Sequence, residues 1–280
     1  MGHFPEIPGT SVPTLDAAAC AGLADALTGI AAQAAKTVLA LATGAGLRHK
    51  ADGSPVTAAD EAAESTICEG LRRTAPDLPV ISEEQAALDK PRAIAHGSYF
   101  LVDPLDGTRE FVAGLDEYTI NIALVTDGTP LLGVVCAPAL GLIWRGVSGR
   151  GAERLAIRGD GGLAQPENIR TRTRPDRDPV ILVSRSHLDA QTKAFVEALP
   201  GAKRVACGSS LKFCRLAEAA ADIYPRLAPT HDWDIAAGHA LLVAAGGSVT
   251  APDGGSVRYG TSELLIPGFI ALADRRPITG

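Results

Sequence analysis

Cysteine and aromatic residues are scarce in this chain. Aromatic side chains account for 4% of its 280 residues, and its five cysteines are scattered at Cys20, Cys68, Cys136, Cys207 and Cys214. An odd number of cysteines without C-x-x-C spacing argues against both a disulfide framework and a cysteine zinc cage. The pattern is typical of a protein that works in a reducing cytoplasm.

Basic residues are also fewer than acidic residues. Lysine and arginine number 26 against 32 aspartates and glutamates, so the formal net charge is −6. A nucleic-acid-binding protein would be expected to show a basic face with aromatic residues among the basic ones. We therefore expect no nucleic-acid partner, and a polyanionic substrate would have to be attracted by a few basic side chains placed locally.

Signals for export, lipidation and membrane insertion are absent. The start, Met1 to Glu6, has no basic segment followed by an apolar one, and Glu6 stands where a myristoylation motif requires Ser or Thr. The most apolar candidate for a span, about residues 15–43, is interrupted by Asp25 and Lys36. We expect a cytoplasmic protein without a transmembrane segment; a homodimer and a peripheral position on the inner face of the cell membrane stay open.

The length and the 46% hydrophobic content allow a large core, in one domain or in two subdomains. Composition and periodicity predict a flexible lead-in over 1–13, an N-terminal α+β region over 14–178 with most of the candidate metal ligands, and a C-terminal α/β region over 179–280. The polar, arginine-rich stretch 150–179 reads as a solvated connection more readily than as an anion site. The expected helices are 15–42, 57–75, 189–199, 209–220 and 232–245, and the expected strands are 79–82, 99–103, 119–126, 130–137, 141–147, 180–184, 204–207 and 223–224.

The most informative segment is Asp103-Pro104-Leu105-Asp106-Gly107-Thr108, which directly follows the apolar run from Tyr99 to Val102. Carboxylates this close repel one another at neutral pH unless one is protonated or a cation lies between them. Oxygen ligands of this kind suit Mg²⁺. An ordinary Asp-Gly turn is the alternative interpretation of this hexapeptide alone.

Three further acidic motifs occur in the chain: Thr57-Ala58-Ala59-Asp60, Ser82-Glu83-Glu84, and His231-Asp232-Trp233-Asp234 followed by Ile235-Ala236-Ala237-Gly238. The order T-A-A-D, S-E-E, D-P-L-D-G-T and W-D-x-A-A-G resembles that of the lithium-sensitive, Mg²⁺-dependent phosphatases of the inositol monophosphatase superfamily, from about Leu15 to Phe269. The segments Gly208 to Cys214 and Tyr224-Pro225-Arg226 resemble the branch that acts on 3'(2'),5'-bisphosphate nucleotides, the CysQ-type phosphatases of sulfate assimilation. The resemblance implies an α+β fold, a layered αβαβα sandwich of the sugar-phosphatase type.

The resemblance also implies a metal centre and a general base. Two or three Mg²⁺ ions would be held by Glu83, Asp103, Asp106, Asp234 and the backbone carbonyl of Leu105. As in other two-metal sites, one ion would lower the pKa of a bound water and the other would stabilise the departing ester oxygen. Thr108 and Asp60 would orient and deprotonate the attacking water, because a threonine hydroxyl alone has too high a pKa.

Each of these acids also has a structural interpretation. Asp60 completes a capping box with Thr57, a role compatible with catalysis, and Asp234 suits the first turn of a helix whatever its function. Asp232, like Ser209 or Ser210, is a candidate helix N-cap. Glu84 is expected behind the site, because sequence neighbours rarely face the same cavity.

Substrate choice is expected to depend on basic residues. Lys212 and Arg226 would hold a phosphate that is not cleaved, Ser209 would bind the same phosphate or the ribose, and His187 would line the base pocket, although surface charge alone is the simpler interpretation for most lysines and arginines. The full set expected to contact substrate is Glu83, Leu105, Asp106, Gly107, Thr108, His187, Ser209, Lys212, Arg226 and Asp234.

The sequence thus predicts hydrolysis of adenosine 3',5'-bisphosphate to AMP and phosphate, with 3'-phosphoadenylyl sulfate as a second substrate. An inositol monophosphatase or a fructose-1,6-bisphosphatase is the alternative within the class, and a non-catalytic sensor of nucleotides or metals is the alternative outside it. His231 and His239 are expected on the core or a helix face, and Trp233 is expected to pack. Arg185 and the basic loop 170–177 have no assigned role.

Overall fold

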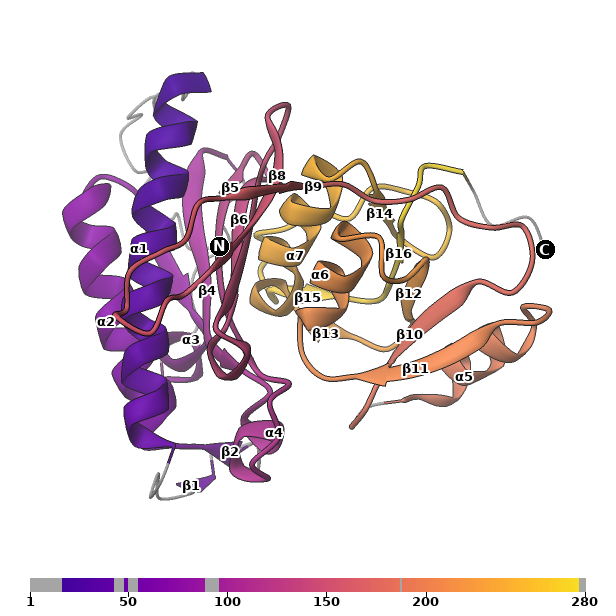
Figure 1. The fold of residues 1–280 in the computed structure, drawn as a ribbon, viewed down its shortest axis with the longest axis horizontal. Helices are drawn as coiled ribbons and strands as arrows, with labels where there is room; N and C mark the ends of the chain where they lie inside the picture. Colours follow the sequence, from indigo (N-terminus) through magenta and orange to yellow (C-terminus); the bar gives the residue numbers. More distant parts are fainter. Residues whose placement is uncertain (1–16, 43–47, 50–54, 89–95, 187, 277–280) are drawn as a thin grey trace, which may run out of the picture.

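The protein is built of five alternating layers of helix and sheet (Figure 1). The computed structural model describes residues 17–42, 48–49, 55–88, 96–186 and 188–276. Two long helices cover one face of a seven-stranded sheet, two helices fill the space between this sheet and a five-stranded sheet, and one helix covers the far side. This arrangement confirms the expected α+β layered sandwich.

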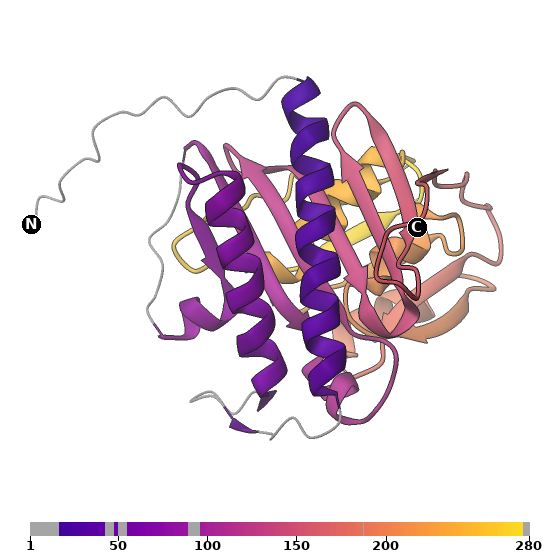
Figure 2. The same ribbon diagram turned by 60° about the vertical axis from the view of Figure 1, so that its left-hand side comes forward.

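The outer layer consists of α1 (Ala17–Leu41) and α2 (Ala58–Thr74), which lie side by side across the sheet (Figure 2). Both helices confirm the sequence prediction to within two residues at each end. Thr57 is the N-cap of α2, and the capping box with Asp60 is present. Among the described residues no helix is long and apolar enough to cross a membrane.

The larger sheet has the strand order β3-β4-β5-β6-β7-β8-β9, and every neighbouring pair is antiparallel except β3 and β4. Apolar residues at nearly every position of the central strands, buried on both faces, made these strands predictable from sequence. The strands are β3 (Val80–Ser82), β4 (Ser98–Asp106), β5 (Thr119–Thr126), β6 (Thr129–Ala137), β7 (Leu142–Val147), β8 (Gly151–Ala156) and β9 (Glu167–Ile169).

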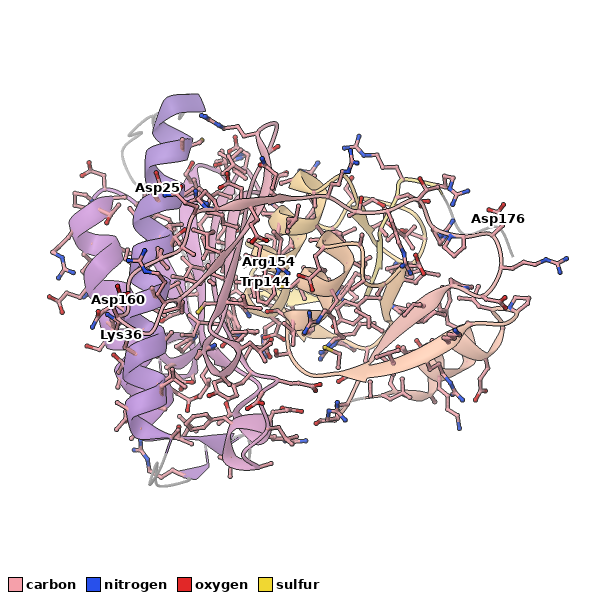
Figure 3. The ribbon with its side chains drawn as sticks, in the orientation of Figure 1. Asp25, Lys36, Trp144, Arg154, Asp160 and Asp176 are labelled. Carbon is pink, nitrogen blue, oxygen red and sulfur yellow. The ribbon has the colours of Figure 1, made fainter. Side chains whose placement is uncertain are left out.

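Strands β8 and β9 correct the prediction of a solvated connection over 150–179. The charged residues of these strands bind one another and the middle layer: Arg154 pairs with Glu167 at 2.8 Å and also approaches Glu218 at 3.4 Å. Trp144 of β7 donates to the same Glu218 carboxylate at 3.0 Å, so both side chains point from the sheet toward α6 (Figure 3). Because the charged residues of β8 and β9 find their partners on other segments, the sequence pattern did not indicate strands at this edge of the sheet.

The middle layer holds α6 (Leu211–Ala217) and α7 (Asp232–Ala244). Gly133 of β6 allows α7 to lie directly on the sheet, since a Cβ atom at this glycine would come within 2.1 Å of the Ala237 carbonyl oxygen. One hydrophobic core, which includes Trp144 and Phe213, joins the larger sheet, the middle helices and the smaller sheet. The division at 178/179 falls between the two sheets, but it remains a prediction because this core is shared.

The smaller sheet has the order β11-β10-β12-β16-β14; its first three strands are parallel, and β16 runs antiparallel to both neighbours. The sequence predicted the first three but missed β14 and β16, which are short and lie among turns. The elements of this layer are β10 (Val180–Ser184), β11 (Lys203–Cys207), β12 (Ile223–Arg226), β14 (Ser248–Thr250), β16 (Phe269–Leu272) and the covering helix α5 (Ala190–Glu197).

The basic loop 170–177 runs beside this sheet. Arg172 makes a two-pronged ion pair with the fully buried Asp222, with both nitrogen–oxygen distances at 2.8 Å, and the backbone N–H of Arg174 donates to Asp274 at 3.0 Å. These bonds tie the loop to the C-terminal layers. The remaining short elements are β1 (Arg48–His49), β2 (Pro55–Val56), α3 (Glu83–Leu88), α4 (Thr108–Val112), η1 (Pro138–Leu140), β13 (Thr230–His231) and β15 (Leu265–Ile266).

Candidate active site

A cavity of about 280 Å³ opens where the ends of several elements meet. Nine of the ten residues expected to contact substrate line it, and His187 lies outside the described residues. The lining residues come from both sheets and from helices in between: Glu83, Asp103, Leu105, Asp106, Gly107, Thr108, Arg109, Glu110, Ser184, Ser209, Ser210, Lys212, Tyr224, Arg226, His231, Trp233, Asp234 and Ile235.

Strand pairing brings the acidic motifs together. Because β3 and β4 are parallel neighbours with Ser82 opposite Val102, the acids that follow these two residues, Glu83 and Asp103, come to the same end of the sheet. Asp106 lies at the end of β4, where the register with β5 shifts after Asp103. Asp234 arrives from the first turn of α7. Four carboxylates from remote segments therefore line one cavity.

The pKa values of these acids show how unfavourable four charges are here. Asp103 is 1% exposed, and burial, followed by the charges of Glu83, Asp106 and Asp234, raises its pKa well above the ordinary value. Burial and the Asp234 charge raise the pKa of Asp106 to about 7, against the opposing effect of Lys212. Such shifts are what closely placed carboxylates show when no cation compensates them.

The donor set suits a hard divalent cation. The four carboxylates offer oxygen ligands, and a positive ion would remove the repulsion that raises the two pKa values. Among the described residues, no three acidic, histidine or cysteine side chains already stand at metal-ligand spacing. Three of the acids are instead held by backbone N–H groups: Asp103 accepts from Leu105 at 3.1 Å, Asp106 from Ser210 at 2.6 Å and Asp234 from His231 at 3.1 Å.

Asp60 and Thr108 meet at the base of this cavity. The Thr108 hydroxyl donates to Asp60 Oδ1 at 3.1 Å and also lies 3.2 Å from the Leu105 carbonyl oxygen. The other carboxylate oxygen of Asp60 accepts from the amide and the hydroxyl of Thr57, each at 2.7 Å. Burial raises the pKa of Asp60, partly offset by these hydrogen bonds. The same carboxylate therefore completes the capping box through one oxygen and accepts the hydrogen bond of Thr108 through the other.

Two basic side chains face the acids across the cavity. Lys212 is 2% exposed; its Nζ donates to the carbonyl oxygens of Cys207 and Ser209 at 3.1 and 2.6 Å, and lies 4.9 Å from the centre of the Tyr224 ring. Arg226 ends β12 and donates to the Pro229 carbonyl oxygen at 3.3 Å. Burial lowers the pKa of Arg226, but Tyr224 and the cavity acids outweigh it and raise the pKa overall. Both side chains are therefore held in place by hydrogen bonds and are not ordinary surface charges.

Of the two predicted helix caps, the one at Ser210 is confirmed in position and the one at Asp232 was wrong. Ser210 occupies the N-cap position of α6 but makes no side-chain cap bond. Its hydroxyl instead contacts Thr119 Oγ1 at 2.8 Å and donates to Asn121 at 2.6 Å. Asp232 is the first residue inside α7 rather than its cap, and its fully buried carboxylate accepts from the Gly260 amide at 2.7 Å.

Several cavity residues were missed by sequence reasoning. His231 was expected on the core or a helix face, but it lines the cavity and its ring stacks on that of Trp233, with centres 4.6 Å apart. Trp233 packs in the hydrophobic core, as predicted, and also lines the cavity. Glu110 also lines it and accepts a hydrogen bond from the Ser186 hydroxyl. In the sequence, the only signal that His231 and Trp233 line the cavity is their position next to Asp234, and no signal indicates Glu110. Glu84 is buried beside the cavity and does not line it, as expected.

Comparisons with known proteins agree with the fold and with the motif order. The model of the inositol monophosphatase family matches residues 18–275. The 3'(2'),5'-bisphosphate nucleotidase CysQ of Escherichia coli strain K12 is 40% identical over 222 residues, which cover 79% of this chain and 86% of that protein. The CysQ protein of Buchnera aphidicola is 36% identical over 230 residues, which cover 80% of this chain and 83% of that protein.

A solved structure extends the similarity to three dimensions. The crystal structure of CysQ from Bacteroides thetaiotaomicron aligns with a TM-score of 0.76 at 33% identity, and the alignment covers 91% of this chain and 98% of that one. The alignment thus spans most of both chains.

Proposed function

The chain belongs to the inositol monophosphatase family, and from that premise we propose that it is a 3'(2'),5'-bisphosphate nucleotidase that converts adenosine 3',5'-bisphosphate to AMP and phosphate. The observation that supports this proposal most strongly is that Lys212 and Arg226 line the same cavity as four carboxylates. The CysQ relatives are named for this activity. We include 3'-phosphoadenylyl sulfate as a second substrate, because it offers the same 3'-phosphate beside a second anionic group.

We assign the acidic side of the cavity to Mg²⁺. Glu83, Asp103, Asp106 and Asp234 would hold two or three ions together with the Leu105 carbonyl oxygen. Bound there, the ions would lower the pKa of a water molecule and stabilise negative charge on the phosphate that is cleaved. By binding these ions, the carboxylates would hold this phosphate near the end of β4, next to Thr108.

Asp60 and Thr108 supply the base. Thr108 lines the cavity while Asp60 does not, so the threonine hydroxyl would contact the attacking water and the carboxylate would receive the proton. The raised pKa of Asp60 improves its capacity to accept that proton near neutral pH. The bonds from Thr57 hold the carboxylate in the orientation this transfer requires.

The basic side of the cavity explains a preference for two phosphates. A guanidinium and an ammonium group form charge-assisted hydrogen bonds with an anion, and each such bond contributes roughly 1.5–3 kcal/mol. Lys212 already gives two of its three protons to carbonyl oxygens, so it has one N–H left for a phosphate. A sugar phosphate without a second anion would leave Arg226 unused, which argues against an inositol monophosphatase.

Phosphate release from a small substrate panel tests this function. With Mg²⁺ present we expect adenosine 3',5'-bisphosphate to be hydrolysed with a higher kcat/KM than inositol 1-phosphate or fructose 1,6-bisphosphate, and EDTA to abolish the reaction. A preference for either sugar phosphate would reject the nucleotide assignment. Binding of the nucleotide without any turnover in Mg²⁺ would instead favour a sensor.

A further inference from the structure

Three polar residues at alternate positions, Glu117, Thr119 and Asn121, point at one turn, Gly208 to Ser210. Alternate residues of an extended chain lie on the same face, so Glu117, two residues before β5, and the first strand residues Thr119 and Asn121 form a row of side chains. Glu117 Oε2 accepts from the Gly208 amide at 2.8 Å. Ser210 contacts the other two: its hydroxyl lies 2.8 Å from Thr119 Oγ1 and donates to Asn121 Oδ1 at 2.6 Å.

The turn adopts a conformation that requires such support. Ser209 has a φ of 44°, in the left-handed region that a serine rarely adopts. Gly208 lies so close to Glu117 that a Cβ atom at the glycine would be 2.6 Å from the Glu117 carbonyl oxygen. Lys212 follows the turn and donates to its Ser209 carbonyl oxygen at 2.6 Å. The position of the lysine therefore depends on the shape of the turn.

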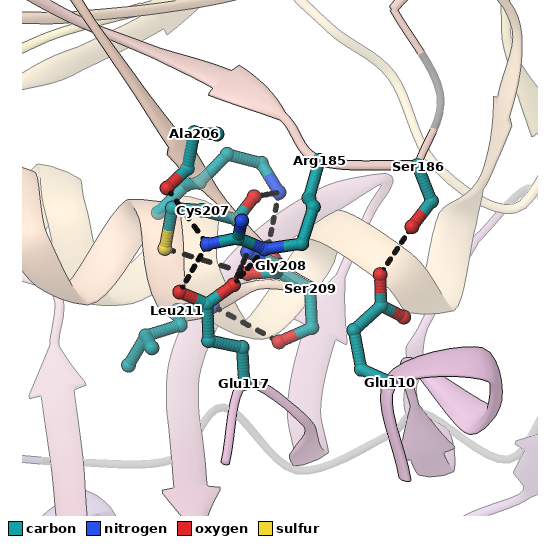
Figure 4. A network of polar contacts seen from close by, with 10 residues as sticks. Glu110, Glu117, Arg185, Ser186, Ala206, Cys207, Gly208, Ser209 and Leu211 are labelled. Carbon is teal, nitrogen blue, oxygen red and sulfur yellow. Dashed lines mark hydrogen bonds and ion pairs between the residues drawn. The ribbon is translucent and has the colours of Figure 1, made fainter. Parts of the chain in front are cut away.

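Arg185, at the end of β10, fixes the orientation of Glu117. Its Nε and Nη2 donate to the two carboxylate oxygens at 2.7 and 2.8 Å, and Nη2 also lies 3.3 Å from the Ala206 carbonyl oxygen (Figure 4). The arginine lowers the pKa of Glu117, so the carboxylate is ionised at neutral pH. The pair thus clamps the end of β11 and the turn that follows it.

We propose that Glu117, oriented by Arg185, and Thr119 and Asn121 are positioning residues that set the affinity for the phosphate that is not cleaved. This inference rests on the proposed function, in which Ser209 and Lys212 serve that phosphate. The acids that would hold the cleaved phosphate come from β4, α3 and α7. One of them, Asp106, accepts from the Ser210 amide at 2.6 Å and from the Thr119 hydroxyl at 3.5 Å, whereas Glu117 is bonded to Gly208 and Arg185. Loss of the Glu117 side chain should therefore weaken binding of a bisphosphate more than binding of a 3'-monophosphate.

The test compares kcat/KM for adenosine 3',5'-bisphosphate with kcat/KM for adenosine 3'-monophosphate, which lacks the second phosphate. In Glu117→Ala the ratio of the two values is expected to fall about tenfold, mainly through KM for the bisphosphate, as one charge-assisted hydrogen bond would cause. Glu117→Gln keeps an acceptor for the Gly208 amide, so it should recover part of the ratio. Glu69→Ala removes the exposed ion pair with Arg73 on α2 and should leave the ratio at the wild-type value.

A merely structural role for Glu117 would lower kcat/KM for both substrates by the same factor. An unchanged ratio in Glu117→Ala, with the variant folded and active, would overturn the inference and leave the proposed function intact. If the wild-type protein fails to hydrolyse the bisphosphate, the proposed function itself fails.

Discussion

Asp60 accepts hydrogen bonds from two threonines that belong to different segments, and the two bonds serve different ends. Thr57 anchors one oxygen at the start of α2, which leaves the other oxygen for the Thr108 hydroxyl. A carboxylate held in this way needs no rearrangement before it accepts a proton. At the scale of the residue, the helix cap and the base are parts of the same structure.

Removing the carboxylate charge should therefore affect the reaction far more than the fold. We expect Asp60→Asn to lower kcat by roughly 10²–10⁴, the range of positioned base catalysis, and Thr108→Val to do the same. The double variant should be no slower than either single one, because the two groups act as a unit. Steady-state phosphate release measures this effect.

Thr57→Ala is the matched control for the cap. It removes the hydroxyl bond to Asp60 Oδ2 but keeps the bond from the backbone N–H, which continues to hold the carboxylate, so it should lower the unfolding free energy by about 0.5–2 kcal/mol while most of kcat remains. If it lowered kcat as much as Asp60→Asn, the cap rather than the base would explain both variants.

Arg226 should decide between substrates. Arg226→Ala is expected to raise KM for adenosine 3',5'-bisphosphate by about tenfold or more, which corresponds to the loss of a charged hydrogen bond, with a much smaller change for adenosine 3'-monophosphate. Initial-rate kinetics on the two nucleotides measure both constants. Equal changes would show that Arg226 shapes the cavity without contacting the second phosphate.

At the scale of the element, α7 is seated by its contact with β6. Gly133→Ala would force a methyl group against the Ala237 carbonyl oxygen, and such overpacking typically costs about 1–3 kcal/mol. Because Asp234 projects from the first turn of α7, the variant should also weaken Mg²⁺ binding. Thermal unfolding and calorimetric titration report the two effects.

Gly22→Ala is the corresponding control in α1, where a Cβ atom would meet nothing within 4 Å. Alanine favours a helix over glycine by roughly 0.5–1 kcal/mol, so this variant should be slightly more stable and bind Mg²⁺ as the wild type does. Equal stability of Gly133→Ala and the wild type would show that α7 can shift without cost.

The elements also show what limits prediction from sequence. Strands β5 and β6 are apolar and bounded by turn residues, and an Asp127-Gly128 hairpin turn joins them, so their pattern was visible. Strand β8 carries the ion-pairing residues Glu153 and Arg154, whose partners lie on other segments. A single sequence does not reveal such pairings, and the strand therefore resembled a loop.

The same limit applies to the site. The acids were identified because each stands in a recognisable motif with a fixed order along the chain. Arg185 had no motif, and its partner Glu117 is 68 residues away. Which side chains meet across the cavity depends on the parallel pairing of β10 and β11 and on the turn after β11, and the folded structure alone shows this.

At the scale of the whole molecule, the cavity acids couple stability to pH and to metal. The pKa values of Asp103 and Asp106 are raised in the folded protein, to about 7 for Asp106, from an ordinary value near 3.8. Stability from these groups is therefore fully present below pH 3.8 and is lost as the pH rises through 7. Mg²⁺ binds the ionised carboxylates, so it should restore what the higher pH removes.

We thus expect Mg²⁺ to raise the thermal midpoint more at pH 8 than at pH 5, relative to EDTA. Ligand at about 100 times its Kd adds roughly 2.7 kcal/mol to the folded state, which is a readily measured shift. Asp106→Asn should reduce the difference between the two pH values. The same Mg²⁺ effect at both pH values would show that the acids of the cavity do not bind the ion.

The most direct test is the anomalous scattering of Mn²⁺, used in place of Mg²⁺, in crystals of the protein. Anomalous peaks are predicted inside the cavity, within ligand distance of Asp103 and Asp106 and bordered by Glu83 and Asp234. Peaks found only elsewhere on the protein, with these four acids turned away from one another, would contradict a metal-dependent phosphatase site.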